Sequence, residues 1–369
     1  MNIGIIADRL GLDTGGLETY ERGLLQGLAA CDTSHAFTVY CARPDAVRAV
    51  VGGDGRFSVR GVCEQSPWLR QSVGLAWRVA RGHDDLVHAC FVPPLLTGRP
   101  MVATIHDLGP FIAPDHLPWQ ISARIKLLLS RAVRGSRLLI AVSEATRRDI
   151  LDVFHVDPAR VKVVHPGIDA QFFPAPADGS VPLPAGFPER YVLYLGRIEP
   201  RKNLPALLAA YRLLRTRHRI PHRLVVAGKI EFWGRREIEE HAALLGPDVV
   251  FPGYVPRAAL PAVYRGAECL AFPSLLEGFG LPPLEAMACG TPVVASDLPA
   301  HREMLGDAAV LVDAHDPERL ADAILRTLED AALRDRLRAD GPRTAASYSW
   351  TEAARRTVGI YELGAALGE

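Results

Sequence analysis

Short apolar runs alternate with longer amphipathic stretches along almost the whole length of the chain. The apolar runs cover residues 3–7, 37–41, 86–88, 101–105, 138–142 and 161–164 in the first half, and residues 191–195, 223–227, 249–251, 269–272, 291–295 and 309–312 in the second. This alternation is typical of parallel strands that are joined by crossover helices. We therefore predict an α/β protein in which each half forms its own doubly wound parallel sheet.

A proline-rich segment separates the two halves. Residues 174–188 contain five prolines and two glycines, a composition that can continue neither a helix nor a sheet. We predict an N-terminal domain over residues 1–173, a linker over 174–189 and a second domain over 190–348. Ser349 is a candidate N-cap for an amphipathic stretch, so residues 349–369 are predicted to form a closing helix.

The charge balance and the cysteine pattern narrow the class of protein. The 42 basic residues (Lys and Arg) are matched by 42 acidic ones, so no net charge attracts the chain to nucleic acid. The six cysteines form no Cys-x-x-Cys pair and lie mostly in apolar surroundings, which predicts reduced thiols and a cytoplasmic protein. No apolar run approaches the roughly 20 residues of a membrane-spanning helix, and we expect no export signal.

The most informative segment, residues 274–290, follows one of the predicted strands. It passes through Gly278 and Gly280 and then enters a short helix that prolines can begin and Gly290 can end. Glycines let backbone amides approach a ligand closely, and the start of a helix adds partial positive charge. We therefore expect an anion to bind at this turn.

Two glutamates flank the turn. Glu277 precedes it and Glu285 lies about one turn into the helix, so both carboxylates can face one cleft. Carboxylates accept hydrogen bonds from hydroxyl groups but cannot hold a phosphate. A phosphate with polyhydroxylated groups on either side, as in a nucleotide sugar, meets both requirements. The alternative is structural: Glu277 caps the helix and Glu285 is a solvated residue on it.

A second strand-end loop, at residues 196–203, carries basic side chains. Arg197 and Lys202 precede a helix for which Asn203 is a plausible N-cap, so the two side chains can converge on an anion. Lys202 is one of four lysines among the 42 basic residues, so a composition that otherwise prefers arginine has kept a compact ammonium group here. The alternative is an ordinary exposed lysine.

The first half of the chain offers weaker candidates. Gly15 and Gly16 stand at a predicted helix start, where their amides can approach an anion, but the sequence around them matches neither a dinucleotide-binding nor a Walker A motif. His106 follows the predicted strand at 101–105. It can hydrogen-bond a sugar hydroxyl or, alternatively, its own neighbouring backbone.

Two further patterns concern partners. No two aspartates stand at positions i and i+2, and His and Cys do not cluster at zinc spacing. We therefore predict that no metal is used and that Arg197, Lys202 and helix-terminal amides neutralise the leaving diphosphate. Residues 119–137 form a predicted helix with one apolar face and several basic residues. We expect it to pack in the domain with a solvated basic side, the alternative being peripheral contact with the inner face of a membrane.

Together these motifs resemble those of the retaining GT-B glycosyltransferases, the glycosyltransferase family 4 or glycosyl transferases group 1. That family includes bacterial mannosyl- and glucosyltransferases of cell-envelope polysaccharide and glycolipid assembly. The likeness rests on Gly196-Arg197 with Lys202-Asn203, on Glu277-Gly278-Phe279-Gly280-Leu281 followed by Glu285, and on residues 288–294. Similar stretches at residues 15–18, 104–108, 141–144 and 165–169 extend it over nearly the whole chain. One departure is His165, where many relatives have asparagine.

The resemblance implies a GT-B fold, in which two Rossmann-like domains face each other across a cleft, and it implies roles for individual residues. Glu285 would bind the ribose hydroxyls, Glu277 the transferred sugar, and Arg197 with Lys202 the diphosphate. The other implied donor contacts are the backbone amides of Gly278, Phe279, Gly280 and Leu281, those of Gly15 and Gly16, and the side chain of His106.

The resemblance also implies a retaining reaction that needs no protein nucleophile and no cofactor, because the leaving phosphate accepts the proton of the acceptor. We predict transfer of a hexose, with GDP-mannose as the preferred donor, to a hydroxyl of a saccharide or glycolipid. The first alternative is a UDP-sugar donor (glucose or N-acetylglucosamine) with a polysaccharide or natural-product acceptor. Alternatives of other classes are a nucleotide-sugar epimerase of the same architecture, a nucleotide-binding dehydrogenase and a non-catalytic binding module.

Overall fold

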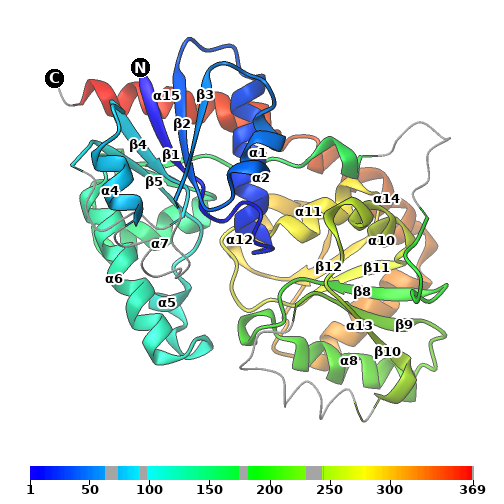
Figure 1. The fold of residues 1–369 in the computed structure, drawn as a ribbon. Coiled ribbons are helices and arrows are strands. Elements are labelled where there is room, and N and C mark those ends of the chain that lie inside the picture. The colour runs from blue at the N-terminus through cyan, green and yellow to red at the C-terminus, as the bar shows by residue number, and fades with distance from the viewer. Residues whose placement is uncertain (63–73, 92–97, 174–181, 230–242, 244, 368–369) are drawn as a thin grey trace. The chain divides into compact units, whose positions relative to one another are not determined.

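The chain divides into two compact units in the computed structural model (Figure 1), which describes residues 1–62, 74–91, 98–173, 182–229, 243 and 245–367. Unit 1 comprises Met1–Gly167 together with Tyr348–Glu369, and unit 2 comprises Ile168–Ser347. The division after Gly167 lies a few residues before residue 173, where we predicted the first domain to end. Most of the predicted linker, residues 174–181, lies outside the described residues.

Unit 1 is built on a parallel sheet of seven strands in the order β3-β2-β1-β4-β5-β6-β7. The strands are β1 (Asn2–Ile6), β2 (Ala36–Cys41), β3 (Phe57–Gly61), β4 (Leu86–Ala89), β5 (Met101–Ile105), β6 (Leu138–Ala141) and β7 (Val161–Val163). The helices are α1 (Gly16–Ala30), α2 (Pro44–Val51), α4 (Leu75–Ala80), α5 (Gly109–Ile112), α6 (Trp119–Gly135), α7 (Glu144–Phe154) and α15 (Trp350–Ala366), and short 3₁₀ turns η2 (Pro114–His116) and η3 (Pro158–Arg160) join some of them.

Two glycines on α1 make room for the C-terminal helix α15. A Cβ atom at Gly23 would lie 1.9 Å from Cε2 of Trp350, and one at Gly27 would lie 2.2 Å from the carbonyl oxygen of Trp350. Glycines one helical turn apart therefore let α1 and α15 approach more closely than larger side chains would allow. This contact returns the end of the chain to unit 1.

Unit 2 is built on a parallel sheet of six strands in the order β10-β9-β8-β11-β12-β13. Figure 1 shows α8 and α13 on one face of this sheet and α10, α11 and α14 on the other. The strands are β8 (Tyr191–Leu195), β9 (Arg223–Ala227), β10 (Val249–Gly253), β11 (Cys269–Phe272), β12 (Val293–Ser296) and β13 (Val310–Val312). The helices are α8 (Leu204–Thr216), α10 (Leu260–Gly266), α11 (Leu281–Ala288), α12 (Pro299–Leu305), α13 (Pro317–Glu329) and α14 (Ala331–Ala345). The 3₁₀ turns are η4 (Ala170–Phe172), η5 (Pro200–Lys202), η7 (Gly246–Asp248), η8 (Arg257–Ala259) and η9 (Gly306–Ala308).

The predicted α/β class with two doubly wound parallel sheets is confirmed, and each predicted apolar run overlaps a strand. The prediction missed β3. This strand pairs with β2 at the edge of its sheet, and its residues alternate between half-buried and exposed. An edge strand needs fewer apolar side chains than a central one, so its sequence carries a weaker signal.

Two further expectations concerned reduced cysteine thiols and the absence of a membrane-spanning helix. The described cysteines are free thiols, and all of them are buried except Cys31, which is partly exposed, while Cys63 lies outside the described residues. Within the part of the chain that the structure describes, no helix is both long and apolar enough to cross a membrane.

Candidate functional site

The loop between β8 and α8 places Lys202 in the interior of unit 2. The loop ends in the 3₁₀ turn η5, and Asn203, in a left-handed conformation with φ of 54°, precedes α8. Asn203 was a plausible N-cap for α8, but its side chain makes no capping hydrogen bond. Instead its Nδ2 donates to the carbonyl oxygen of Ala314 at 2.8 Å. This bond ties the loop to a distant part of unit 2 and fixes the position of Lys202.

Lys202 and Glu277 form a buried ion pair. The Lys202 Nζ lies 2.5 Å from Oε1 of Glu277, and their side chains are 9% and 7% exposed. Arg201 stands beside the pair, with Nη1 3.6 Å from Oε2 of Glu277 and Nε 2.6 Å from Oε1 of Glu199. The Lys202 ammonium also lies 5.0 Å from the centre of the Phe272 ring. The interpretation of Lys202 as an ordinary exposed lysine is therefore wrong.

The charges around Glu277 keep it ionised. Burial alone would raise its pKa, but the Lys202 ammonium, and next the Arg201 guanidinium, lower the pKa of Glu277 to about 2. Burial lowers the pKa of Lys202, and the Glu277 carboxylate opposes this effect. Two opposite charges in a place that excludes water stabilise each other, and either would be costly to bury alone.

The glycine turn and the start of α11 follow Glu277 directly. Gly280 has a φ of 98°, which side chains rarely tolerate, so a glycine is needed at this position. Leu281 begins the helix, and a proline in its first turn needs no backbone hydrogen bond there. The turn at Gly278, Phe279 and Gly280 thus leads straight from the ion pair into a helix N-terminus, where backbone amides favour an anion.

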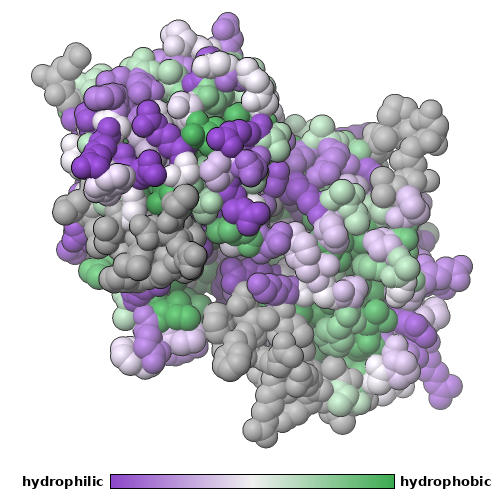
Figure 2. Space-filling view, viewed as in Figure 1, coloured by the Kyte–Doolittle hydropathy of each residue, from purple (hydrophilic) through white to green (hydrophobic). Residues whose placement is uncertain are grey.

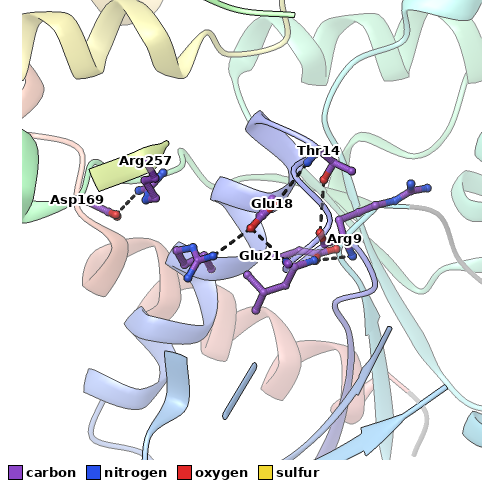
Figure 3. Close-up of polar contacts among 9 residues, drawn as sticks. Arg9, Thr14, Glu18, Glu21, Asp169 and Arg257 are labelled. Carbon is purple, nitrogen blue, oxygen red and sulfur yellow. Dashed lines mark hydrogen bonds and ion pairs between the residues drawn. The ribbon is translucent and has the colours of Figure 1, made fainter. Parts of the chain in front are cut away.

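Glu285 is buried one turn further along α11. It is 5% exposed, so the alternative that it is a solvated helix residue is wrong. Its Oε2 accepts a hydrogen bond of 2.8 Å from the hydroxyl of Tyr264. Burial raises the pKa of Glu285, while Arg257 and the Tyr264 hydroxyl oppose this effect. Arg257 is itself ion-paired with Asp169 (Figure 3), so a second set of charged and polar groups surrounds this carboxylate.

Of the two basic residues predicted for this site, Lys202 contacts the Glu277 carboxylate. The backbone carbonyl oxygen of Arg197 accepts a hydrogen bond of 3.1 Å from the Tyr194 hydroxyl. Arg201, which sequence reasoning did not single out, is the guanidinium nearest Glu277 among the described ion pairs. Its position next to Lys202 in a strand-end loop was the available signal.

His301 was also missed. It lies in α12, is fully buried, and its Nδ1 is 2.7 Å from the carbonyl oxygen of Ser296. A Cβ atom built on Gly280 would lie 3.2 Å from its Nε2. Nothing in the sequence indicated that α12 would bring this histidine under the glycine turn.

In unit 1, two glutamates of α1 hold the loop that leads from β1 to Gly15 and Gly16 (Figure 3). Glu21, which is 1% exposed, accepts hydrogen bonds from the backbone amides of Arg9 and Leu10 at 2.9 and 2.8 Å. Glu18 accepts from the amides of Gly11 and Thr14 at 3.1 and 3.3 Å, and its ion pair with Arg22 spans 3.0 Å; these contacts fix the loop without using Gly15 or Gly16.

Gly15 and Gly16 stand exposed at the N-terminus of α1. Gly15 has a φ of 69°, and a Cβ atom added to Gly16 would meet nothing within 4 Å. The space beside Gly16 is therefore open to a ligand. Sequence reasoning identified these two glycines but not the carboxylates of Glu18 and Glu21 that position them.

His106 is largely buried behind β5. Its Nε2 lies 2.7 Å from the carbonyl oxygen of Cys90, so Nε2 donates and Nδ1 is left as the acceptor. Burial lowers the pKa of His106, which favours the neutral ring. The Tyr20 ring stands edge-on to it at 4.7 Å. The structure thus shows a backbone contact, to Cys90, as in the second alternative, and Nδ1 keeps a lone pair.

One further prediction concerns metals. Among the described residues, no group of three or more His, Cys, Asp or Glu side chains is arranged to hold a metal ion. The cations beside the glycine turn are instead those of Lys202 and Arg201.

Two family models match the chain. Residues 14–172 match the model described as Glycosyltransferase Family 4, and residues 184–344 match the model described as Glycosyl transferases group 1. The first match lies almost entirely in unit 1. The second contains Lys202, Glu277, Glu285 and the glycine turn.

Individual proteins match over most of their length. The O-antigen chain mannosyltransferase B of Escherichia coli is 31% identical over 298 residues, which cover 78% of this chain and 77% of that protein. The D-inositol 3-phosphate glycosyltransferase of Frankia alni is 32% identical over 387 residues, covering 95% and 94%. The crystal structure of Anabaena Alr3699/HepE in complex with UDP and glucose matches with a TM-score of 0.74 and 20% identity, covering 98% of this chain and 99% of that one.

Proposed function

This chain belongs to the glycosyltransferases of family 4 and group 1 and has the GT-B fold, and from this premise we propose the reaction that it catalyses. It transfers a hexose from a nucleotide diphosphate sugar to a hydroxyl of a saccharide or glycolipid acceptor. The anomeric configuration is retained and no metal ion or other cofactor is required. Family membership favours this reaction over the epimerase, dehydrogenase and binding-module alternatives.

One observation carries the proposal: the Lys202–Glu277 ion pair beside the glycine turn of α11. In a nucleotide sugar, the phosphate and the hexose are joined through a single oxygen atom. A site for this molecule needs a cation for the phosphate next to a hydrogen-bond acceptor for the sugar hydroxyls. Lys202 and Glu277 supply these two groups, 2.5 Å apart. The ammonium would bind the diphosphate, and the carboxylate would accept hydrogen bonds from the sugar.

Resemblance to the family implies the remaining contacts. The buried Glu285 carboxylate would accept hydrogen bonds from the ribose hydroxyls, with Tyr264 holding it in place. The amides of residues 278–281 would donate to the donor, and Arg201 or Arg197 would add positive charge. The same resemblance implies that the amides of Gly15 and Gly16 bind the diphosphate and that His106, whose Nδ1 is an acceptor, binds the sugar.

The chemistry balances without a protein nucleophile. The bond between the anomeric carbon and the diphosphate oxygen breaks, and the acceptor oxygen bonds to the same face of that carbon. The acceptor's proton passes to the departing phosphate oxygen. Lys202 stabilises the negative charge that develops on this phosphate, which is the role of preorganised cations in group transfer.

We infer GDP-mannose as the preferred donor, supported by a relative that is named a mannosyltransferase. A UDP-sugar carrying glucose or N-acetylglucosamine is the alternative. The relative named for D-inositol 3-phosphate favours a second acceptor class, a phosphorylated cyclitol, beside saccharides and glycolipids. A turnover screen with GDP- and UDP-sugars against both acceptor classes tests this choice.

The experiment for the reaction combines three readouts. Purified protein treated with a chelator should release nucleoside diphosphate when donor and acceptor are both present, and NMR of the product should show the donor's anomeric configuration. Sugar conversion without an acceptor would reveal an epimerase. Inverted product, or turnover restored only by a divalent metal, would contradict the corresponding part of the proposal.

Helix α6 packs in unit 1 through Leu129, Ala132 and Val133, as we expected, and we further propose the alternative role for its exposed side, peripheral contact with the inner face of an anionic membrane. Trp119 and Leu127 on this helix are 74% and 59% exposed, and Arg124, Arg131 and Arg134 are exposed beside them. Figure 2 shows hydrophobic and hydrophilic groups close together over this part of unit 1. The protein should sediment with vesicles that contain phosphatidylglycerol, and Trp119→Ser/Leu127→Ser should remain in the supernatant. Equal sedimentation of the two proteins would refute the contact.

A further inference from the structure

A buried histidine of unit 2 has an acceptor atom without a partner. His301 is 0% exposed, and its Nδ1 lies 2.7 Å from the carbonyl oxygen of Ser296. A carbonyl oxygen only accepts hydrogen bonds, so Nδ1 carries the proton and Nε2 carries a lone pair. Within the described part of the chain, no hydrogen-bond partner reaches Nε2.

The unpartnered atom faces the glycine turn. Nε2 would lie 3.2 Å from a Cβ atom built on Gly280, the residue that precedes α11. The imidazole lies 5.8 Å from the centre of the Phe272 ring, and the Lys202 ammonium lies 5.0 Å from the same centre. His301 therefore belongs to the surroundings of the Lys202–Glu277 pair, although it comes from a different helix.

The state of the ring restricts what it can bind. Burial lowers the pKa of His301, and the Glu277 charge opposes this only in part, so the ring is neutral at neutral pH. A neutral Nε2 accepts a hydrogen bond but cannot donate one. Phosphate oxygens of a nucleotide are acceptors as well, so they cannot satisfy it, whereas a hydroxyl group can. A buried acceptor that stays unpaired is unfavourable, so a hydroxyl that reaches it gains binding energy.

We propose that His301 is a specificity-determining residue for the transferred sugar, and that its Nε2 accepts a hydrogen bond from one hydroxyl of the hexose. This inference rests on the proposed function, because the hydroxyl is that of the nucleotide sugar. Gly280 then has a second role besides its positive φ: it leaves the side of the turn that faces Nε2 without a side chain. Glu277 and His301 together would present two acceptors to one sugar.

Calorimetry with a bare nucleoside diphosphate and with the corresponding nucleotide hexose tests the proposal. His301→Phe keeps a planar ring but removes the acceptor. It should change the Kd for the bare diphosphate by less than about 2-fold and weaken binding of the nucleotide hexose by about 5- to 10-fold, the loss of one hydrogen bond. His222→Phe is the matched control, because His222 is a buried histidine of unit 2 paired with Arg190, and it should leave the ratio of the two affinities unchanged.

Deoxy donors identify the hydroxyl. One monodeoxy hexose donor should bind the wild-type protein more weakly than the parent donor does, yet bind His301→Phe as well as the parent donor does. If His301→Phe weakens both ligands equally, or neither, or if every deoxy donor loses as much affinity in the variant as in the wild type, His301 makes no contact with the sugar.

Two outcomes separate this inference from the function on which it rests. If the wild-type protein binds neither ligand, the proposed function fails. If it binds both and turns over while His301→Phe behaves like wild type, only the role of His301 fails. Should His301→Phe not fold, ¹⁵N NMR of the wild-type imidazole replaces it: the Nε2 signal should shift with the nucleotide hexose and not with the bare diphosphate, and identical shifts would overturn the proposal.

Discussion

The first loops of the two sheets are built in opposite ways on the same strand order. In unit 1, the loop after β1 is held by the carboxylates of Glu18 and Glu21, which bind its backbone amides. In unit 2, the loop after β8 carries Lys202 into the interior, where Glu277 is its partner. The first arrangement fixes backbone, and the second buries a pair of charges.

This difference indicates which of the two loops takes part in the reaction. Backbone amides held by Glu18 and Glu21 are already satisfied, so that part of unit 1 serves to shape the start of α1. The Lys202–Glu277 pair, with Arg201 beside it, consists of charged side chains, and each of these can turn to a charged or hydroxylated ligand that enters. A common scaffold thus acquires its function from the side chains in its loops.

The largest expected effect comes from removing the buried charges of unit 2. Lys202→Met should lower kcat/KM by about 100- to 1,000-fold through the lost stabilisation of the leaving phosphate. It should also destabilise the protein by about 3 kcal/mol, because the buried Glu277 loses its nearest cation and keeps only the more distant Arg201. Steady-state kinetics and urea unfolding measure the two effects.

Lys202→Met/Glu277→Gln separates stability from catalysis. The double variant removes both charges, so it should recover most of the lost stability and remain as inactive as the single variant. If activity returns together with stability, the pair is structural and the contrast between the two loops disappears.

The pH dependence of stability should have opposite signs at Glu277 in unit 2 and at Glu21 in unit 1. The pKa of Glu277 in the folded state is about 2, below its ordinary value of 4.5, so its contribution is present above pH 4.5 and is lost as the pH falls toward 2. The size of this loss is about 3 kcal/mol. Urea unfolding of wild type and Glu277→Gln between pH 5 and pH 2 measures it.

Glu21 is the counterpart in unit 1. Burial, and next the nearby Asp8, raise the pKa of Glu21 well above its ordinary value, so its ionisation disfavours the folded state and stability falls as the pH rises above 4.5. Glu21→Gln should therefore reduce the loss of stability above pH 4.5. Glu277→Gln should instead reduce the loss of stability below pH 4.5. If both variants change the pH dependence of unfolding stability in the same pH range, the difference between the two glutamates is contradicted.

The smallest effect is expected at the loop of unit 1. Glu18→Ala removes the acceptor of the Gly11 and Thr14 amides and the partner of Arg22, and should destabilise the protein by about 1 to 2 kcal/mol. The KM for the donor should rise by less than about 10-fold with kcat little changed. Arg48→Ala, which breaks an exposed ion pair with Asp45, is the control and should change neither. A fall in kcat as large as that of Lys202→Met would show that this loop takes part in the chemistry.

The sequence was informative wherever a local pattern determines the structure. Apolar runs located the central strands, since strands that are buried on both faces consist almost wholly of such residues. The rarity of lysine pointed to Lys202, and the spacing of Glu277 and Glu285 around two glycines pointed to the turn. Each of these signals lies within a few residues of the feature that it predicts.

Contacts that join distant segments could not be predicted in the same way. Arg201 reaches Glu277, and His301 reaches Gly280, only because the sheet brings β8, β11 and α12 together. The hydrogen bonds of Glu18 and Glu21 depend on the conformation of the loop after β1, for which no pattern of side chains is specific. Contacts that depend on tertiary structure therefore could not be predicted from the sequence.

A crystal structure with an intact nucleotide hexose tests the central claim most directly. The account predicts that a diphosphate oxygen lies within about 3.2 Å of the Lys202 Nζ and that a sugar hydroxyl lies within the same distance of the Glu277 carboxylate. A donor that binds away from this pair, or that leaves Lys202 and Glu277 bonded to each other alone, would contradict it.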